Sequence, residues 1–273
     1  MAVITLDEGG TTFAPTGWSD NTGLVDDATA VIESGEQSIV SALDQTGIQT
    51  DGIFYLHIRA GFTGTIGSPT AGAFTSKFHS TYTAGPNVIL DGGTLYLAVS
   101  GTCAWVLVLS GTLVLVSGTV TLLEKRGGTV YRAGAAVTTT IDSQGGYWQD
   151  TGDNSNAVTT AHFSESTGDM RGAITTLNTY RGSRVTAYAA TATVNMYGGR
   201  LNLIKGGATT INGRAGVLDT TKANLAQTIT TLNRWPHFIH NSPGAAALTT
   251  VTTTVDKVGG PISLTTGQTV GLP

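Results

Sequence analysis

The sequence predicts an all-β chain, folded as a parallel β-helix with about 17–18 residues per turn. The first observation is a seven-residue pattern of Thr, a branched apolar residue, Asn, three variable residues and Gly, which occurs three times between Thr176 and Gly216. The second is composition, because 12% charged residues and 37 glycines suit β-branched strands with tight corners. A short fixed period is the signature of a solenoid, in which each turn of chain stacks on the next.

The repeated pattern also predicts a ladder of side chains. Its asparagines are Asn178, Asn195 and Asn212, which follow one another at intervals of 17 residues. Stacked turns place these amides above one another, so each is expected to hydrogen-bond to the turns on either side. The apolar residue before each Asn is expected to fill the interior. The glycine of each repeat is expected to turn the corner, because glycine tolerates conformations that other residues avoid.

The sequence divides into three predicted parts. Residues 1–34, which Gly and Pro interrupt repeatedly, are expected to form an N-terminal arm or cap. Residues 35–240 are expected to form the solenoid, and residues 241–273 an extended C-terminal tail or cap. Within the solenoid, the polar and acidic stretch 147–171 breaks the rhythm and is predicted to be a surface loop insertion.

One stretch resembles a known class of proteins. Residues 61–67 read Gly-Phe-Thr-Gly-Thr-Ile-Gly and follow Asp44-Gln45 and a short predicted strand. This phrase resembles a recurrent opening in structural proteins of tailed bacteriophages, which are often β-helical and associated with the capsid. The resemblance covers about residues 40–70. It implies a place on the capsid surface of a virion, assembly in the host cytoplasm, and the major capsid protein as partner.

Residues 88–123 form the most apolar block of the chain. Asp91 is its only charge, but Gly-Thr pairs interrupt the block too often for a membrane-spanning helix, so it is interpreted as solenoid. Its strands are apolar on both faces, whereas an isolated solenoid alternates apolar inside with polar outside. Because an exposed apolar patch marks an interface, a homo-oligomer, preferably a homotrimer, is predicted. The predicted oligomer and capsid interface comprises Trp105, Leu107, Leu109, Leu113 and Leu115.

The candidate catalytic groups are carboxylates, which a polysaccharide-cleaving β-helix of the tail-spike type places around a sugar. These candidates are Asp142, Asp150, Asp153, Glu165 and Asp169, with Trp148 as a platform for a sugar ring and Glu124 one period before Asp142. Solvated corner residues are the favoured interpretation. The sequence contains no serine-hydrolase, nucleotide-binding, zinc or calcium motif. The chain is therefore predicted not to be an enzyme and to hold no cofactor or metal.

Charge and cysteine content bear on partners and compartment. The net charge of −4 offers no basic surface to nucleic acid, and the first residues do not form a signal peptide, so neither nucleic acid nor membrane is expected as a partner. Cys103 is the single cysteine and lies in an apolar stretch. It is expected to be a buried, unreactive thiol, which fits assembly in a reducing cytoplasm.

These expectations combine into one predicted function and two alternatives. The predicted function is a structural virion protein, a phage capsid decoration or cement protein that binds capsomers and stabilises the assembled shell. The first alternative is a phage tail spike or fibre segment that binds or cleaves host surface polysaccharide through an acidic groove at 150–169. The second is an ice-binding or adhesin solenoid, for which Thr176, Thr193 and Thr210 supply one rank of hydroxyls. Handedness and oligomer symmetry stay open at this point.

Overall fold

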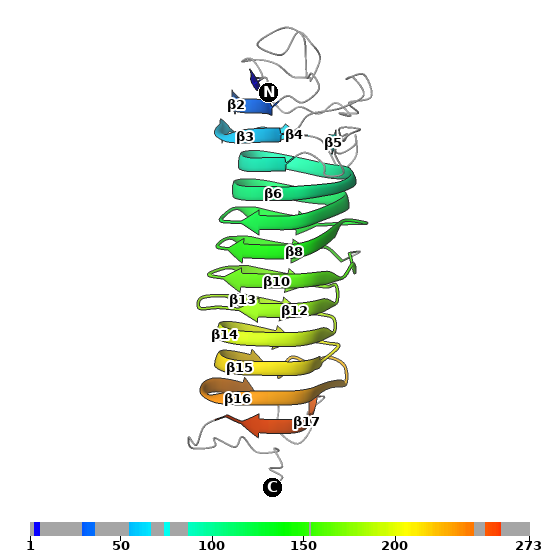
Figure 1. Ribbon diagram of the computed structural model, residues 1–273, viewed down its shortest axis with the longest axis vertical. Helices are drawn as coiled ribbons and strands as arrows, with labels where there is room; N and C mark the ends of the chain where they lie inside the picture. The colour runs from blue at the N-terminus through cyan, green and yellow to red at the C-terminus, as the bar shows by residue number, and fades with distance from the viewer. Residues whose placement is uncertain are drawn as a thin grey trace. The chain divides into compact units, whose positions relative to one another are not determined.

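The fold is a parallel β-solenoid, which confirms the predicted fold class. The computed structural model describes residues 3–5, 29–35, 55–66, 74–76, 87–152, 154–242 and 249–257. Every regular element within these ranges is a β-strand. The chain divides into two compact units, residues 1–156 and 157–273, and Figure 1 labels most of their strands.

The described part of unit 1 contains strands that pair in parallel. They are β1 (Val3–Thr5), β2 (Thr29–Gly35), β3 (Tyr55–Phe62), β4 (Thr65–Ile66), β5 (Phe74–Ser76), β6 (Asn87–Lys125), β7 (Thr129–Arg132), β8 (Val137–Gln144) and β9 (Tyr147–Asp150). Most of the predicted arm, residues 1–34, lies outside the described residues. Its described parts are strands, because β1 pairs with β2 and β2 pairs with β3.

Glycines make the corners of unit 1. The φ angles of Gly111 and Gly128 are 76° and 64°, in the left-handed region that glycine adopts without steric cost. A Cβ atom on Gly128 would lie 2.5 Å from the carbonyl oxygen of Gly111. The corners therefore stack glycine on glycine, and both the backbone conformation and the close approach require this residue.

The interior of unit 1 contains charged groups as well as apolar ones. Val106, Val108 and Val130 have no exposed surface, and neither has Lys125. The Lys125 ammonium donates a hydrogen bond to the carbonyl oxygen of Gly145. Burial lowers the pKa of Lys125 to about 8, because the charged form loses its hydration inside the fold.

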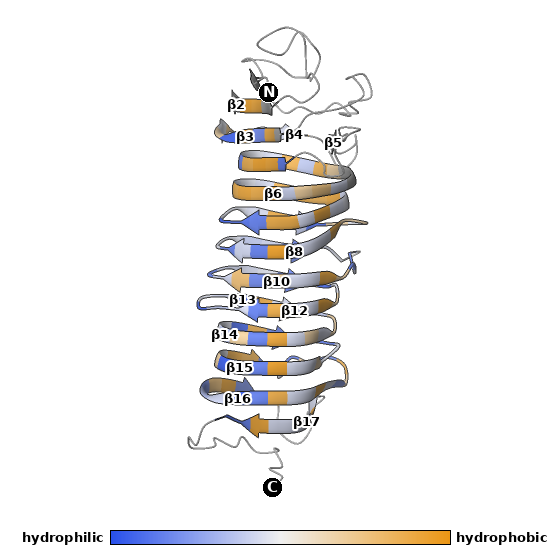
Figure 2. Cartoon of the chain, in the orientation of Figure 1, coloured by the Kyte–Doolittle hydropathy of each residue, from blue (hydrophilic) through white to orange (hydrophobic). Residues whose placement is uncertain are grey.

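Unit 2 has the same architecture, with parallel strands paired from turn to turn. Its strands are β10 (Val158–Ser164), β11 (Thr167–Met170), β12 (Ile174–Thr179), β13 (Arg184–Ala187), β14 (Thr191–Leu203), β15 (Ala208–Asp219), β16 (Gln227–Asn241) and β17 (Thr249–Asp256). Leu177, Val194, Ile211 and Leu232 pair in register on successive strands and are fully buried. Figure 2 shows the result as aligned apolar and polar columns across β12, β14, β15 and β16.

The structure has strands where the sequence predicted a surface loop insertion at 147–171. β9, β10 and β11 occupy most of this stretch, and Trp148 and Asp150 have no exposed surface. The prediction was wrong because it took polar residues as a sign of solvent. The Asp150 carboxylate is instead paired with the guanidinium of Arg132 inside the solenoid.

The last described strand belongs to the predicted tail, residues 241–273. β17 pairs in parallel with β16, matching Thr231 to Thr253 and Asn233 to Val255. Much of the predicted tail, including Leu248, lies outside the described residues.

His240 makes the stability of unit 2 depend on pH. Burial and the nearby Arg234 charge lower its pKa to about 4, against the opposing effect of Asp219. In the unfolded chain, the His240 imidazole binds a proton below its normal pKa of 6.5. In the folded chain, the same imidazole stays neutral down to about pH 4. Stability is therefore complete above about pH 6.5 and falls as the pH drops towards 4.

We expect acidification from about pH 7 to about pH 4.5 to lower the free energy of unfolding through His240 by about 2 kcal/mol. Urea unfolding at the two pH values measures this loss. His240→Gln should remove most of it, whereas His237→Gln, at an exposed position, should leave it unchanged. Equal pH dependence in all three chains would contradict the assignment to His240.

Candidate functional site

The predicted interface residues divide between the surface and the core of unit 1. Trp105 and Leu107 are half-buried, and Leu109 is 39% exposed, so these three form an outward apolar stripe on β6. Leu113 and Leu115, in contrast, have no exposed surface and belong to the core. This corrects their assignment to the interface.

The corner at Gly111 explains the division. Leu109 and the three residues after it all have some exposed surface, and the inward alternation resumes at Leu113. The odd-numbered residues from 105 to 109 therefore face outward before the corner, whereas Leu113 and Leu115 face inward after it. A strand pattern by itself has a period of two and does not reveal such a change of phase.

Cys103 lies where the sequence predicted. Its side chain is 1% exposed, and its thiol donates to the carbonyl oxygen of Trp105 at 3.4 Å. Burial raises the pKa of this thiol to about 11. The protonated thiol is a poor nucleophile, so the structure gives this residue a packing role.

Three candidate carboxylates of unit 1, Glu124, Asp142 and Asp150, lie beside cations. Arg132 donates to both carboxylate oxygens of Asp150, at 2.8 and 2.7 Å, and Trp148 Nε1 donates to the same group at 3.1 Å. Glu124 pairs in register with Asp142, as their spacing predicted, and the Arg126 guanidinium lies 3.4 and 3.7 Å from them. Asp150 and Trp148 are thus unavailable to a sugar.

The two acidic candidates of unit 2 lie at its surface. Glu165 is exposed in the turn between β10 and β11, and Asp169 is half-buried on β11. The remaining candidate, Asp153, lies outside the described residues. Among the described residues, no group of three or more His, Cys, Asp or Glu side chains is arranged to hold a metal ion.

The predicted asparagine ladder is present in unit 2. Asn195 donates to Asn178 Oδ1 at 2.9 Å, and Asn212 donates to Asn195 Oδ1 at 2.9 Å. A further rung follows, because Asn233 donates to Asn212 Oδ1 at 2.8 Å. The ladder meets His162 at its other end, where Asn178 Nδ2 lies 3.4 Å from His162 Nδ1. The interval of 21 residues before Asn233 hid this rung from the 17-residue pattern.

A column of rings lies beside the ladder, two residues further along each strand. Tyr180 and Tyr197 stack with centroids 5.2 Å apart and planes 9° from parallel. The Arg214 guanidinium then lies 5.1 Å from the centre of the Tyr197 ring and 5.6 Å from that of Trp235. Tyr197 is 41% exposed. This column was not predicted from the sequence, although its members share one position of the repeat.

Threonines form two further ranks on the same strands. Register aligns the first rank, Thr160, Thr176, Thr193, Thr210, Thr231 and Thr253. The preceding residue on each of these strands is exposed, and it is Thr everywhere except at Ala192. The outer face of unit 2 therefore presents hydroxyl, amide and aromatic groups in parallel columns, with the Arg214 guanidinium in place of a ring on β15.

No protein-family model matches the chain, and comparison with curated proteins and with solved structures gives no match either. In the part of the chain that the structure describes, there is no helix long and apolar enough to cross a membrane.

Proposed function

We propose that this protein is a structural component of a tailed-bacteriophage virion, a capsid decoration or cement protein that binds the major capsid protein on the assembled shell. The observation that carries the proposal is the outward apolar stripe of Trp105, Leu107 and Leu109 on β6. An apolar stripe on a low-charge solenoid favours a protein partner, because its burial removes apolar surface from water. The phage-like phrase at residues 61–67 supports the same assignment.

The proposed mechanism is mass action without catalysis, cofactor or metal. A subunit that binds the assembled shell more tightly than it binds other states of the shell protein lowers the free energy of the assembled shell. Self-association of the chain as a homotrimer would multiply the contacts of each particle with the shell, because linked sites bind together more tightly than single ones. Neither nucleic acid nor a membrane is a proposed partner.

The copy number of the chain in purified particles from its source tests the proposal. Quantitative peptide mass spectrometry against the major shell protein should give a simple stoichiometric fraction of the shell. The double variant Leu107→Asp/Leu109→Asp should lower the copies per particle at least tenfold, a loss of about 1.4 kcal/mol in binding. Thr121→Asp, at an exposed position of the same strand, should leave the copy number unchanged.

Two outcomes would contradict the proposal. A wild-type copy number that matches only the few tail appendages would place the chain in the tail. An unchanged copy number for the double variant, with circular dichroism like that of the wild type, would remove the apolar stripe as the docking surface.

The outer face of unit 2 favours a second candidate function, adhesion to polysaccharide as part of a tail spike or fibre. Aromatic rings, amides and hydroxyls are the groups that contact the C–H and O–H groups of sugars, and all three stand in columns on this face. From the sequence, this role was predicted for an acidic groove at 150–169. The burial of Asp150 favours the columns of unit 2 instead.

A further inference from the structure

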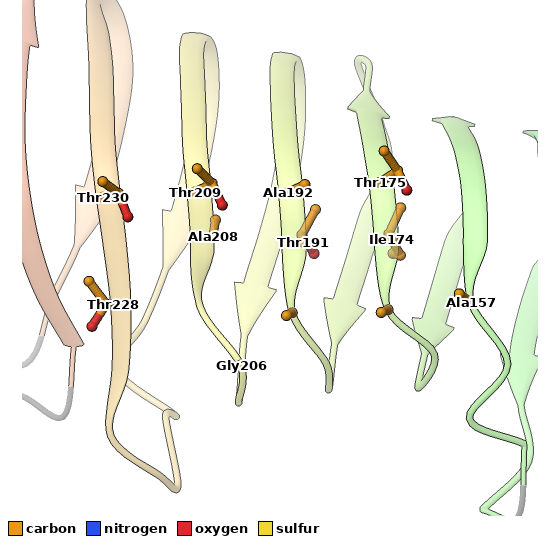
Figure 3. A pocket seen from close by; sticks show the side chains of 12 residues that line it. Ala157, Ile174, Thr175, Thr191, Ala192, Gly206, Ala208, Thr209, Thr228 and Thr230 are labelled. Carbon is orange, nitrogen blue, oxygen red and sulfur yellow. The ribbon is translucent and has the colours of Figure 1, made fainter.

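A groove of about 340 Å³ runs across the strands of unit 2. Figure 3 shows its labelled side chains on successive turns, from Ala157 to Thr230. Small side chains line it on successive turns, among them Ala173, Ala190 and Ala208. One side is formed by exposed threonines, such as Thr209, from the second rank, in which each residue precedes a threonine of the first rank.

The groove contains a buried polar group that has no partner in the described structure. Thr191 is 1% exposed and lines the groove, and its Oγ1 makes no hydrogen bond there. An unsatisfied buried hydroxyl costs about 1–3 kcal/mol, so a ligand whose binding turns this hydroxyl into the groove and gives it a partner would recover this loss. The hydroxyls of Thr175, Thr209 and Thr228 line the same groove.

The chemistry of the lining defines the ligand. None of the described residues that line the groove carries a charge. An ionic ligand would lose hydration there without a counter-charge, and a nucleic acid would find no cation for its phosphates. The lining supplies methyl groups and hydroxyls, and stacked strands repeat them at a spacing of about 4.8 Å.

We propose that this groove binds an extended neutral polysaccharide whose sugar units lie along successive turns of unit 2. The exposed hydroxyls of Thr175, Thr209 and Thr228 hydrogen-bond to sugar hydroxyls, while the alanine methyl groups contact the C–H faces of the rings. A peptide strand fits less well, because strand addition needs unpaired backbone groups at a sheet edge. Here β12, β14, β15 and β16 already pair with one another in parallel.

This inference deepens the second candidate function, adhesion to polysaccharide, and rests on it for its biological setting. It does not depend on where the protein sits in a particle. The copy number tests the location and a binding assay tests the groove, so the two can fail separately.

Affinity electrophoresis of the full chain in native gels tests the groove. The gels contain dextran, a mixed-linkage β-glucan or a galactomannan as neutral probes, and alginate as an anionic comparison. At least one neutral polysaccharide should retard the chain, alginate should not, and added salt should leave the retardation unchanged because no charges are involved.

Two variants of different chemistry then block the groove. Ala192→Trp fills it and Thr209→Lys places a charge in it, and both positions are exposed. Each should raise the dissociation constant for the retarding polysaccharide at least tenfold. The matched controls are Thr167→Trp and Thr167→Lys, because Thr167 is exposed on β11 and does not line the groove. Circular dichroism confirms that each variant is folded.

Two results would overturn the inference. The first is the absence of retardation by all of the neutral probes, and the second is equal retardation of groove variants and controls. If the first result is accompanied by thermal hysteresis in freezing assays, the threonine ranks are assigned to an ice surface instead of a sugar chain.

Discussion

Replacement of Asp150 by alanine is expected to lower the free energy of unfolding by about 3–5 kcal/mol. Arg132 and Asp150 form an ion pair whose side chains both have no exposed surface. Trp148 Nε1 and two guanidinium nitrogens donate to the Asp150 carboxylate. Removal of this carboxylate leaves the Arg132 charge buried without its counter-ion. The free-energy cost of that unpaired charge is larger than the net stabilisation that the ion pair provides. Urea unfolding followed by far-ultraviolet circular dichroism measures the loss.

Two controls separate burial from the simple loss of a charge. Asp256→Ala breaks the more exposed pair of Arg234 and Asp256, whose side chains are 13% and 38% exposed, and should cost less than about 1 kcal/mol. The double variant Arg132→Met/Asp150→Leu should regain much of the lost stability, because no charge is left buried. If Asp150→Ala costs no more than Asp256→Ala, the buried pair does not stabilise unit 1 as argued.

Replacement of Asn195 by alanine is expected to lower the free energy of unfolding by about 2–3 kcal/mol. Asn195 occupies the middle of the ladder, where it donates to Asn178 and accepts from Asn212. Its truncation therefore removes two hydrogen bonds, each contributing about 1–1.5 kcal/mol. Equilibrium urea unfolding is again the measurement.

Asn233→Ala is the matched control, because Asn233 makes a single ladder bond, to Asn212. It should cost about half as much as Asn195→Ala. Equal losses at the two positions, or a loss at Asn195 below about 0.5 kcal/mol, would show that the ladder does not contribute through its amide bonds.

The sequence alone determined the features that repeat at a constant interval. The 17-residue interval predicted the stacking of Asn178, Asn195 and Asn212, and the structure contains these hydrogen bonds. Gly182, Gly199 and Gly216 were predicted to turn the corners, and all three have positive φ. These features are readable because every turn of a solenoid repeats the same local environment.

Only the tertiary structure decided which side chains meet where the interval between repeats changes. The same holds where a corner shifts the alternation of inward-facing and outward-facing residues. Leu109 is exposed and Leu113 is buried, although both belong to one apolar run. Asp150 is polar in the sequence, yet it lies in the core because the guanidinium of Arg132 stands on the neighbouring strand. The groove of unit 2 likewise joins Ala173, Thr191 and Thr228 from separate turns. The side chains of a strand alternate with a period of two, so one extra outward residue at a corner exchanges the inward-facing and outward-facing residues that follow it. The local sequence pattern does not show that such an exchange has occurred.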